Sequence, residues 1–358
     1  MLEKGKISGF QMALMLYPTV LATGFLTLPT ISAQFAGNDL WMTGILSSFM
    51  GIITVLVVVR LHEIYPNETI VQQTEHIIGV LPSKLLGILL SIYVVRANGL
   101  IIRQYTDFVT GNFLFKTPSL FVTSSMVLLT CITVRGGLEL MARCTVIFTP
   151  LFMFPLLFLL LLFPDLDINN ILPILGRGFI PVLQGSATPL AWISELFLMT
   201  FFLPNLTKPE QGRKWGMISL YLIVLSMTFV NLITLFLLGP DISNKIYPVL
   251  IAFRYISLAN FFENLESLLL AMWVVGNFVK ICVFLYAAVF SFTQTLKLSD
   301  YRPFVFSFGI LTILFSLWDL PNFSALGAVL TYVTPFEIPL VFTLMPLILL
   351  IISRLRSM

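Results

Sequence analysis

Long uninterrupted apolar runs are the feature that most restricts how this chain can fold. A helical run of about 20 apolar residues spans the roughly 30 Å hydrocarbon core of a lipid bilayer. Of the 358 residues, 58% are hydrophobic and only 10% are charged, which leaves too few polar side chains to cover a soluble protein of this size. The sequence therefore predicts an integral membrane protein. It excludes soluble enzymes, nucleic-acid-binding proteins and secreted disulfide-rich scaffolds.

The apolar runs are separated where charged residues, Pro and Gly cluster, and they predict ten transmembrane helices in a single transmembrane domain, residues 1–358. The expected spans are 10–36, 41–61, 85–110, 118–134, 144–163, 179–204, 215–239, 265–296, 304–318 and 325–352. The first span has no cleavage signal, so we expect it to be retained as a helix. Two connections are long enough for short interfacial helices, near 68–78 and 248–258.

The distribution of positive charge predicts the orientation in the membrane. If the N-terminus is cytoplasmic, the outer connections hold only Lys116, Arg177, Lys245 and Arg254, and most other Lys and Arg residues lie on the inner side. Because positive charges accumulate in cytoplasmic loops, both termini are expected in the cytoplasm. The net charge of +3 is too small to indicate a polyanionic partner such as a nucleic acid.

The supply of metal-binding and nucleophilic side chains is small. Cys131, Cys144 and Cys282 lie in or beside apolar runs without CxxC spacing, so we interpret them as small buried hydrophobic residues. His62 and His76 are the only histidines, and they are too few for a zinc or iron site. No Ser/His/Asp or paired-carboxylate set is evident. We therefore expect no metal, no cofactor and no enzymatic activity.

Ten spans divide into two sets of five, residues 10–163 and 179–352, and the second set enters the membrane in the opposite orientation. Inverted repeats of this kind place a ligand near the midplane, where the first helix of each half is broken. Matching candidates for such breaks are the segments 21–29, around Gly24, and 185–195, around Pro189. Unwound peptide groups require a polar partner, and the helix N-termini beside them suit a carboxylate. Alternatively, Gly24 permits close helix packing and Pro189 makes a simple kink.

Charged side chains inside the spans are further candidates, because each costs roughly 2.5–3.5 kcal/mol to insert. They are Arg96, Arg103, Asp107, Glu195, Lys280 and Glu337, and their formal charges cancel. This balance indicates pairing inside the bundle. Arg103 and Asp107 are four residues apart on one helix and are predicted to pair. Arg96 has no local partner, so a structural role and a role in binding or gating both remain open.

Lys280 is open to several interpretations. It can neutralise Glu195, bind a substrate carboxylate, act as a proton carrier, or occupy the place where a sodium-coupled relative holds its ion. Glu337 lies between two prolines in a last span that we expect to be broken, and it is a candidate proton relay. The candidate ligand-binding residues come from spans one, three, six and eight: Thr23, Gly24, Phe25, Tyr93, Arg96, Ala97, Trp192, Ser194, Glu195, Leu196, Asn277, Lys280, Cys282 and Tyr286.

In this order and spacing, several short motifs resemble those of a known membrane-protein family. The family is the B subunit of the nutrient germinant receptors of spore-forming bacteria, within the amino acid, polyamine and organocation transporter superfamily. The resemblance covers nearly the whole chain. It rests on segments 7–11 (ISGFQ), 24–29 (GFLTLP), 65–66 (YP) before a short polar helix, 176–186 (GRGFIPVLQGS) and 194–196 (SEL).

The resemblance implies an all-α, LeuT-like five-plus-five inverted repeat with broken helices 1 and 6 and a small-molecule pocket between spans 1, 3, 6 and 8. It also implies a germinant, expected to be an amino acid, and a complex with a larger A subunit and a lipoprotein C subunit in the spore inner membrane. The backbone near Gly24 would hold the ligand carboxylate, and Glu195 or an unwound carbonyl would hold its ammonium. The alternative is a proton-coupled secondary amino acid transporter that uses the same pocket. A weaker third possibility is that the polar stripes line an ion or water path.

Overall fold

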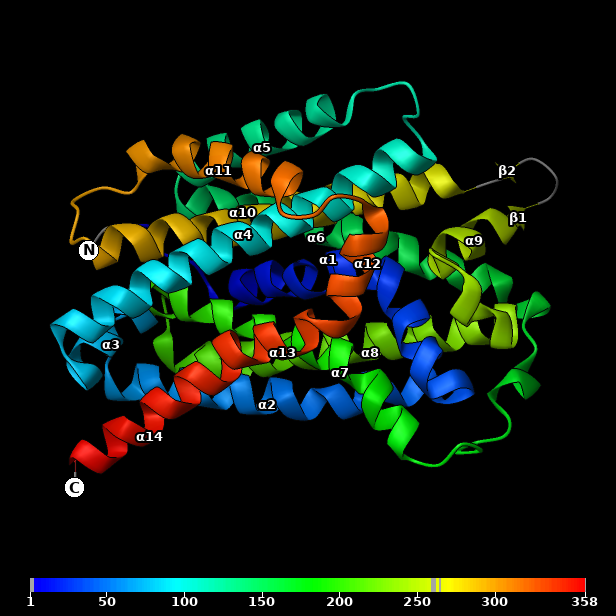
Figure 1. Cartoon of the computed structure of the whole chain (residues 1–358), viewed down its shortest axis with the longest axis horizontal. Coiled ribbons are helices and arrows are strands. Elements are labelled where there is room, and N and C mark those ends of the chain that lie inside the picture. The colour runs from blue at the N-terminus through cyan, green and yellow to red at the C-terminus, as the bar shows by residue number, and fades with distance from the viewer. Residues whose placement is uncertain (1–2, 259–261, 264, 358) are drawn as a thin grey trace.

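The computed structural model describes residues 3–258, 262–263 and 265–357, and these residues are almost entirely helical (Figure 1). The longer helices are α1 (Gly9–Ala36), α2 (Leu40–Ile64), α4 (Val80–Asn112), α5 (Ser119–Arg135), α6 (Leu138–Met153), α7 (Ile180–Ser194), α8 (Gly212–Leu238), α10 (Glu266–Thr295), α11 (Val305–Trp318) and α14 (Met345–Ser357). Shorter helices are α3 (Ile70–Ile78), α9 (Pro248–Tyr255), α12 (Phe323–Tyr332) and α13 (Thr334–Pro339). The short helices expected near 68–78 and 248–258 are therefore confirmed as α3 and α9, and their interfacial location stays a prediction.

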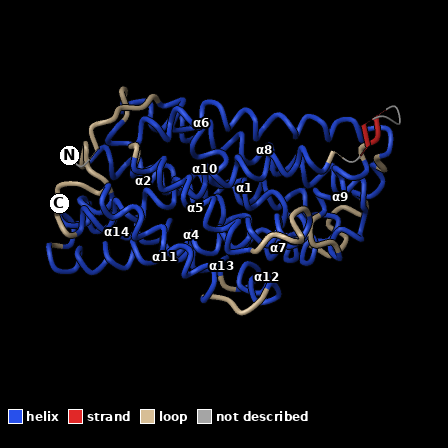
Figure 2. The backbone as a smooth tube through the Cα atoms, turned by 90° about the horizontal axis from the view of Figure 1, so that it is seen from above, coloured by secondary structure: helices blue, strands red, loops and turns tan. Residues whose placement is uncertain are grey.

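Tighter or wider helical turns extend several of these elements. The 3-10 segments are η1 (Gly37–Asp39), η2 (Phe154–Asp165), η3 (Ile168–Ile171), η4 (Glu195–Phe201), η5 (Leu203–Asn205), η6 (Pro209–Gln211), η7 (Gly239–Asn244) and η8 (Arg302–Phe304), and η9 (Leu340–Leu344) is a π-helix. The described strands, β1 (Ser257–Leu258) and β2 (Phe262–Glu263), form one short antiparallel pair. Figure 2 shows this pair at the α9 end of the molecule.

The ten predicted spans all coincide with helical segments. By length and apolar character, six helical stretches of the described residues can cross a bilayer, the first of which combines α1 and α2. A seventh results if α11 and α12 count as one span, although the two helices are bent by 101°. The last predicted span, 325–352, is broken as expected into α12, α13, η9 and α14. Pro335 and Pro339 lie in α13, and proline lacks the N–H that a regular helix requires.

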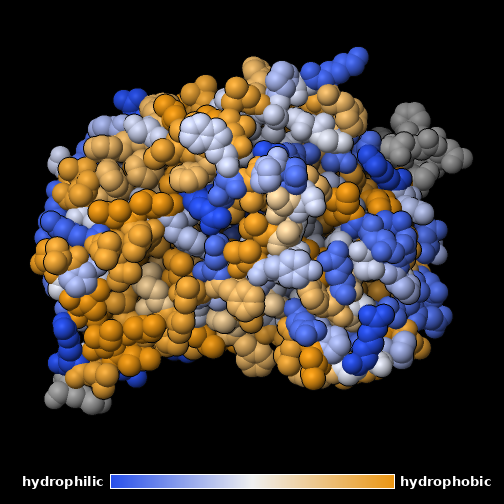
Figure 3. All heavy atoms as spheres, viewed as in Figure 1, coloured by the Kyte–Doolittle hydropathy of each residue, from blue (hydrophilic) through white to orange (hydrophobic). Residues whose placement is uncertain are grey.

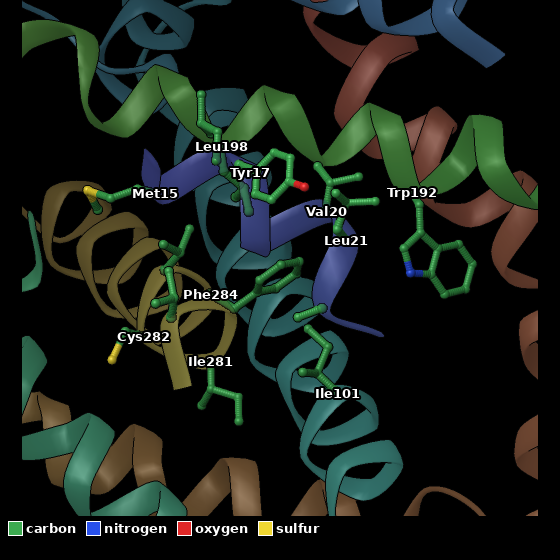
Figure 4. Packing of buried hydrophobic residues seen from close by; sticks show 14 of the residues in the cluster. Met15, Tyr17, Val20, Leu21, Ile101, Trp192, Leu198, Ile281, Cys282 and Phe284 are labelled. Carbon is green, nitrogen blue, oxygen red and sulfur yellow. The ribbon is translucent and has the colours of Figure 1, made fainter. Parts of the chain in front are cut away.

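Helices α1 and α10 form the centre of the bundle. In α1, Leu16, Val20 and Leu21 have no exposed surface, and α10 packs closely against α4. Figure 4 shows labelled side chains of α1, α4 and α10, together with Trp192 and Leu198, that belong to this core. The outer helices instead expose large apolar side chains, and apolar residues cover much of the face in Figure 3. This is the surface that lipid tails favour.

The N-terminal segment, residues 3–8, closes the end of the bundle where both termini lie (Figure 1). The buried Glu3 carboxylate accepts hydrogen bonds from the Tyr301 hydroxyl at 2.9 Å and from the Leu138 N–H at 3.1 Å. The carbonyl of Asn205 accepts a backbone hydrogen bond from the segment at 3.0 Å. Burial and the neighbouring Glu3 carboxylate raise the pKa of the Tyr301 phenol above its ordinary value, so this hydroxyl remains a donor.

Candidate ligand-binding site

A buried ion pair lies between the start of η4 and α10. Lys280 Nζ donates to both carboxylate oxygens of Glu195, at 2.9 and 2.7 Å. Lys280 has no exposed surface and Glu195 is 3% exposed. The ammonium also lies 5.5 Å from the ring centroid of Phe284. Because an unpaired charge at this depth is strongly unfavourable, each side chain requires the other as its partner.

Glu195 lies where the helix changes type. Helix α7 ends at Ser194, and the 3-10 helix η4 begins at Glu195. The Ser194 hydroxyl donates to the Leu190 carbonyl at 3.0 Å and thus caps a local backbone group. The interruption predicted for the sixth span therefore occurs as a change from α to 3-10 geometry at Glu195. It does not occur at Gly185 or Pro189, which both lie within α7.

The interruption predicted for the first span is wrong. Helix α1 runs without a break from Gly9 to Ala36. A Cβ atom at Gly24 would lie 2.8 Å from a Leu28 methyl and 3.2 Å from Trp192 Cδ1. The small residue therefore lets α1 pack closely against Trp192 of α7, which was the alternative interpretation. Since the peptide groups near Gly24 are part of a continuous helix, the predicted binding of a ligand carboxylate to unwound backbone there does not fit.

A second helix contact fixes α1 against α7 at the same level. The Trp192 indole N–H donates to the Thr23 hydroxyl at 2.9 Å, and both residues are buried. Further along, a Cβ atom at Gly185 would lie 3.0 Å from the Ser32 carbonyl oxygen. The small residues of both segments therefore bring α1 and α7 into close contact.

Arg96 has partners from distant parts of the chain. Its Nε lies 3.0 Å from one Asp319 carboxylate oxygen, and its Nη1 lies 3.3 Å from a Glu337 carboxylate oxygen. Asp319 follows α11, and Glu337 lies in α13. The three side chains are 19–36% exposed, so this network is less buried than the Glu195–Lys280 pair. The fold thus supplies the partner that the local sequence around Arg96 lacks.

The predicted pair on α4 is confirmed. Arg103 Nε donates to Asp107 at 2.9 Å, and Arg103 Nη1 donates to the Ser316 carbonyl at 3.2 Å. This pair ties α4 to the end of α11, which is a structural role.

A cavity of about 40 Å³ lies between the two charge networks. The structure brings seven of the candidate residues to its wall: Thr23, Tyr93, Arg96, Ala97, Trp192, Glu195 and Lys280. The cavity is closed on its other sides by residues outside the candidate set: Leu100, Ile101, Gln104, Phe284, Leu330, Thr334, Glu337, Ile338 and Phe342. The formal charges of the lining side chains are two positive and two negative, from Arg96, Lys280, Glu195 and Glu337.

Seven candidate residues do not line this cavity: Gly24, Phe25, Ser194, Leu196, Asn277, Cys282 and Tyr286. Phe25 packs edge-on against Phe152. The Asn277 side-chain amide donates to the Trp273 carbonyl at 2.9 Å. Tyr286 stacks on Phe290 near the termini end of α10. Leu196 is fully buried in the apolar core.

Helical spacing explains part of this difference. Phe284 follows Lys280 by four residues and shares its face of α10, whereas Cys282 follows by two and lies on another side. Leu100 and Gln104 similarly continue the face of α4 that carries Arg96. Leu100, Gln104 and Phe284 were therefore predictable as lining residues from their helical spacing to Arg96 and Lys280. In the last span, Glu337 was distinguished in the sequence by its charge, whereas Leu330 and Phe342 had no signal, because their positions depend on how this span bends.

A family model described as "Spore germination protein" matches residues 6–324, which is most of the chain. The chain belongs to the spore germination protein family. It is similar to spore germination protein YndE of Bacillus subtilis strain 168, with 26% identity over 98% of this chain and 97% of the relative. It is also similar to spore germination protein KB of the same strain, with 24% identity over 98% and 95% of the two chains.

Solved structures of transporters share the fold of this spore germination protein. One is MhsT in complex with L-phenylalanine, with a TM-score of 0.65 and 15% identity over 94% of this chain and 88% of that chain. Another is a substrate-bound Na⁺-coupled sialic acid symporter, with a TM-score of 0.64 and 14% identity over 91% and 76%. The protein is therefore an integral membrane protein with a LeuT-like, permease-type fold.

Proposed function

We propose that this spore germination protein senses a small zwitterionic germinant, an amino acid, in the cavity between the two charge networks. The main support for this proposal is the set of charged side chains that line the cavity. Its two cations and two carboxylates together are neutral, so a zwitterion can enter without adding net charge to a low-dielectric site. The ligand carboxylate would face Lys280 or Arg96, and its ammonium would face Glu195 or Glu337.

In the described conformation the cavity is too small for this ligand. A volume of about 40 Å³ is close to the roughly 30 Å³ that one water molecule occupies in the liquid. An amino acid therefore requires an expanded conformation in which its own charges replace part of the internal pairing. A ligand that binds the expanded form more tightly than the closed form shifts the equilibrium between them. That shift is the signal in this proposal.

The assembly and location of the protein belong to the same proposal. We infer a complex with a larger A subunit and a lipoprotein C subunit in the spore inner membrane, with both termini in the cytoplasm. Three things support it: family membership, the position of both termini at one end of the molecule (Figure 1), and the concentration of Lys and Arg in the connections of that end.

Binding of labelled L-amino acids to the purified protein tests the ligand class. Each amino acid that binds is compared with its amide, which lacks the carboxylate, and with its deamino acid, which lacks the ammonium. We expect binding only when both charges are present, and loss of binding in the double variant Glu195→Gln/Lys280→Gln. The matched control Arg103→Gln/Asp107→Asn removes a pair outside the cavity and should retain binding. Equal binding of the amides, or no binding of any amino acid, contradicts the proposal.

The rival function is proton-coupled amino acid transport through Glu195 or Lys280, and the LeuT-like fold favours it as the second candidate. Uptake into proteoliposomes separates the two. A sensor should bind the amino acid without concentrating it under an imposed pH gradient, and it should co-purify with a larger membrane subunit and a lipoprotein. Robust concentrative uptake by the isolated protein establishes the transporter instead.

A further inference from the structure

An apolar groove lies between α4 on one side and η9 and α14 on the other. It has a volume of about 580 Å³, and every described residue that lines it is Leu, Ile, Val or Met, except Tyr93. Both walls belong to stretches that are long and apolar enough to cross a bilayer. Leu89, Leu344 and Ile348 line the groove and are 44–52% exposed, so it is accessible from the outside of the bundle, where lipid tails lie.

The groove extends through about half of the membrane thickness. Its wall on the last span runs from Leu340 to Ile352, a length of about 18 Å at 1.5 Å per residue. The hydrocarbon core is roughly 30 Å thick, so one leaflet contributes about 15 Å. The groove begins at Ile78, on the side of the termini (Figure 1), and reaches Tyr93, which also lines the central cavity. Its length therefore matches the leaflet on the side of the termini.

The width of the groove distinguishes a lipid chain from a helix of another subunit. A volume of about 580 Å³ over a length of about 18 Å leaves a mean cross-section of about 30 Å². An α-helix with its side chains is about 10–12 Å across and so occupies about 80 Å² or more. A membrane-crossing helix would also continue through the second leaflet. A single hydrocarbon chain fits both the width and the length.

A cation lies at the end of the groove nearest the termini. Arg356 follows Ile352 by four residues and therefore continues the face of α14 that lines the groove. It is exposed and has no ion-pair partner among the described residues. Because lipid tails are as apolar as Leu, apolar contact alone gives the groove little preference for one lipid over another. A guanidinium at its end supplies that preference, since it binds phosphate groups.

We propose that the groove is a phospholipid-binding site. One acyl chain lies between α4 and α14 with its methyl end near Tyr93, and the lipid phosphate contacts Arg356. An anionic headgroup is preferred to a zwitterionic one, because the Arg356 charge has no carboxylate partner among the described residues. The site is separate from the charge networks and does not depend on whether the protein senses or transports.

Lipid titration of the delipidated full-length protein, followed by native mass spectrometry, tests the site. We expect one phosphatidylglycerol molecule to bind more tightly than all later ones, and more tightly than phosphatidylcholine with the same chains. Ile348→Trp fills the groove and should remove this first binding step. Ile147→Trp is the matched control, because Ile147 is similarly exposed but lies on α6. A series of equal binding steps, or an unaltered first step in Ile348→Trp, overturns the proposal.

A second pair of variants tests the contact with the phosphate. Arg356→Gln should weaken the first phosphatidylglycerol about 5-fold, the effect of one cation near an anionic headgroup. Arg213→Gln removes an exposed cation at the start of α8, outside the groove, and should have no effect on this step. Inorganic phosphate and glycerol phosphate lack the chain and should not compete. Competition by either, or equal effects of the two variants, overturns the assignment to a lipid.

Photolabelling locates the chain. The protein receives one equivalent of phosphatidylglycerol that carries a diazirine either at the methyl end of an acyl chain or next to its ester. The first probe should label residues near Tyr93 and Leu340, and the second should label residues 349–356. Labels distributed equally over α6 and α8 would contradict the proposal. No amino acid enters these experiments, so their outcome is independent of the proposed function.

Discussion

The Glu195–Lys280 pair shows how strongly a single residue depends on its partner in this protein. Both side chains are almost completely buried, and their charged atoms are 2.7 Å apart. Breaking such a pair by removing one partner leaves an uncompensated charge, which typically costs about 3–5 kcal/mol, whereas removing both is often far less damaging. The pair is therefore a structural requirement of the closed conformation, whatever else it binds.

Lys280→Met should consequently lower the free energy of unfolding by about 3–5 kcal/mol. The double variant Glu195→Gln/Lys280→Met should recover a large part of that loss, because the isolated carboxylate is also removed. Unfolding of the detergent-solubilised variants measures both effects. Arg60→Met is the control: its pair with Glu63 is about half exposed, so the change should stay below about 1 kcal/mol. Equal losses in the Lys280 variant and the double variant would show that the pair is not the cause.

A second prediction for a single residue concerns Gly24. Gly24→Leu forces a side chain against Leu28 and Trp192, and overpacking of this kind costs about 1–3 kcal/mol. Since Trp192 lines the central cavity, the ligand response should also be lost while membrane insertion is retained. Gly111→Leu in α4 is the matched control, because a Cβ there meets no neighbour within 4 Å. An unchanged dose response in Gly24→Leu would contradict a link between this packing and the cavity.

At the level of elements, the N-terminal segment connects parts of the chain that are far apart in sequence. Glu3 binds the start of α6 at Leu138 and the α10–α11 connection at Tyr301, and the segment also pairs with the chain near Asn205. Any motion that opens this end of the bundle must break these hydrogen bonds. The segment therefore stabilises the closed arrangement of α1, α6 and α10.

Tyr301→Phe removes the hydroxyl donor to Glu3 and keeps the ring. We expect faster hydrogen exchange in residues 3–8 and at the start of α6, by roughly 3- to 10-fold if the hydrogen bond contributes about 1 kcal/mol. Mass-spectrometric hydrogen exchange in detergent or nanodiscs measures this. Tyr332→Phe is the control, because Tyr332 is exposed and lies on α12. Unaltered exchange in both regions would show that the hydroxyl contributes nothing to closure.

Most elements were predictable from the sequence because apolar length alone determines a membrane helix. The positions of α3, α9 and the Arg103–Asp107 pair were also predictable, since they depend on local charge and spacing. The first span was mispredicted because a glycine at position 24 is equally compatible with close helix packing and with helix unwinding. The sequence alone does not distinguish the two. The contact between Asp319 and Arg96 was not predictable either, because Asp319 lies beside the 101° bend between α11 and α12, which local sequence does not determine.

At the scale of the whole molecule, both termini lie at the same end (Figure 1), as an even number of crossings requires. The LeuT-like fold is shared with transporters. The division into repeats 10–163 and 179–352 stays a prediction. So does the cytoplasmic location of the termini.

Cysteine labelling tests this orientation. Ser299→Cys lies in an exposed position of the connection after α10, at the termini end, and Lys116→Cys lies in the exposed connection after α4. In right-side-out vesicles, a membrane-impermeant maleimide should label Lys116→Cys directly and Ser299→Cys only after permeabilisation. The unmodified chain gives the background, since Cys131 and Cys282 are buried and Cys144 is partly buried. The reverse pattern would contradict the predicted orientation.

The charges of the central cavity already neutralise one another before any guest arrives. Under the proposed function, an incoming amino acid would have to replace these ion pairs with its own charges. A solute with a single charge would replace only one side of such a pair and would leave the other charge without a partner. If the protein is the sensor we propose, these internal ion pairs raise the ligand concentration that is needed for a response.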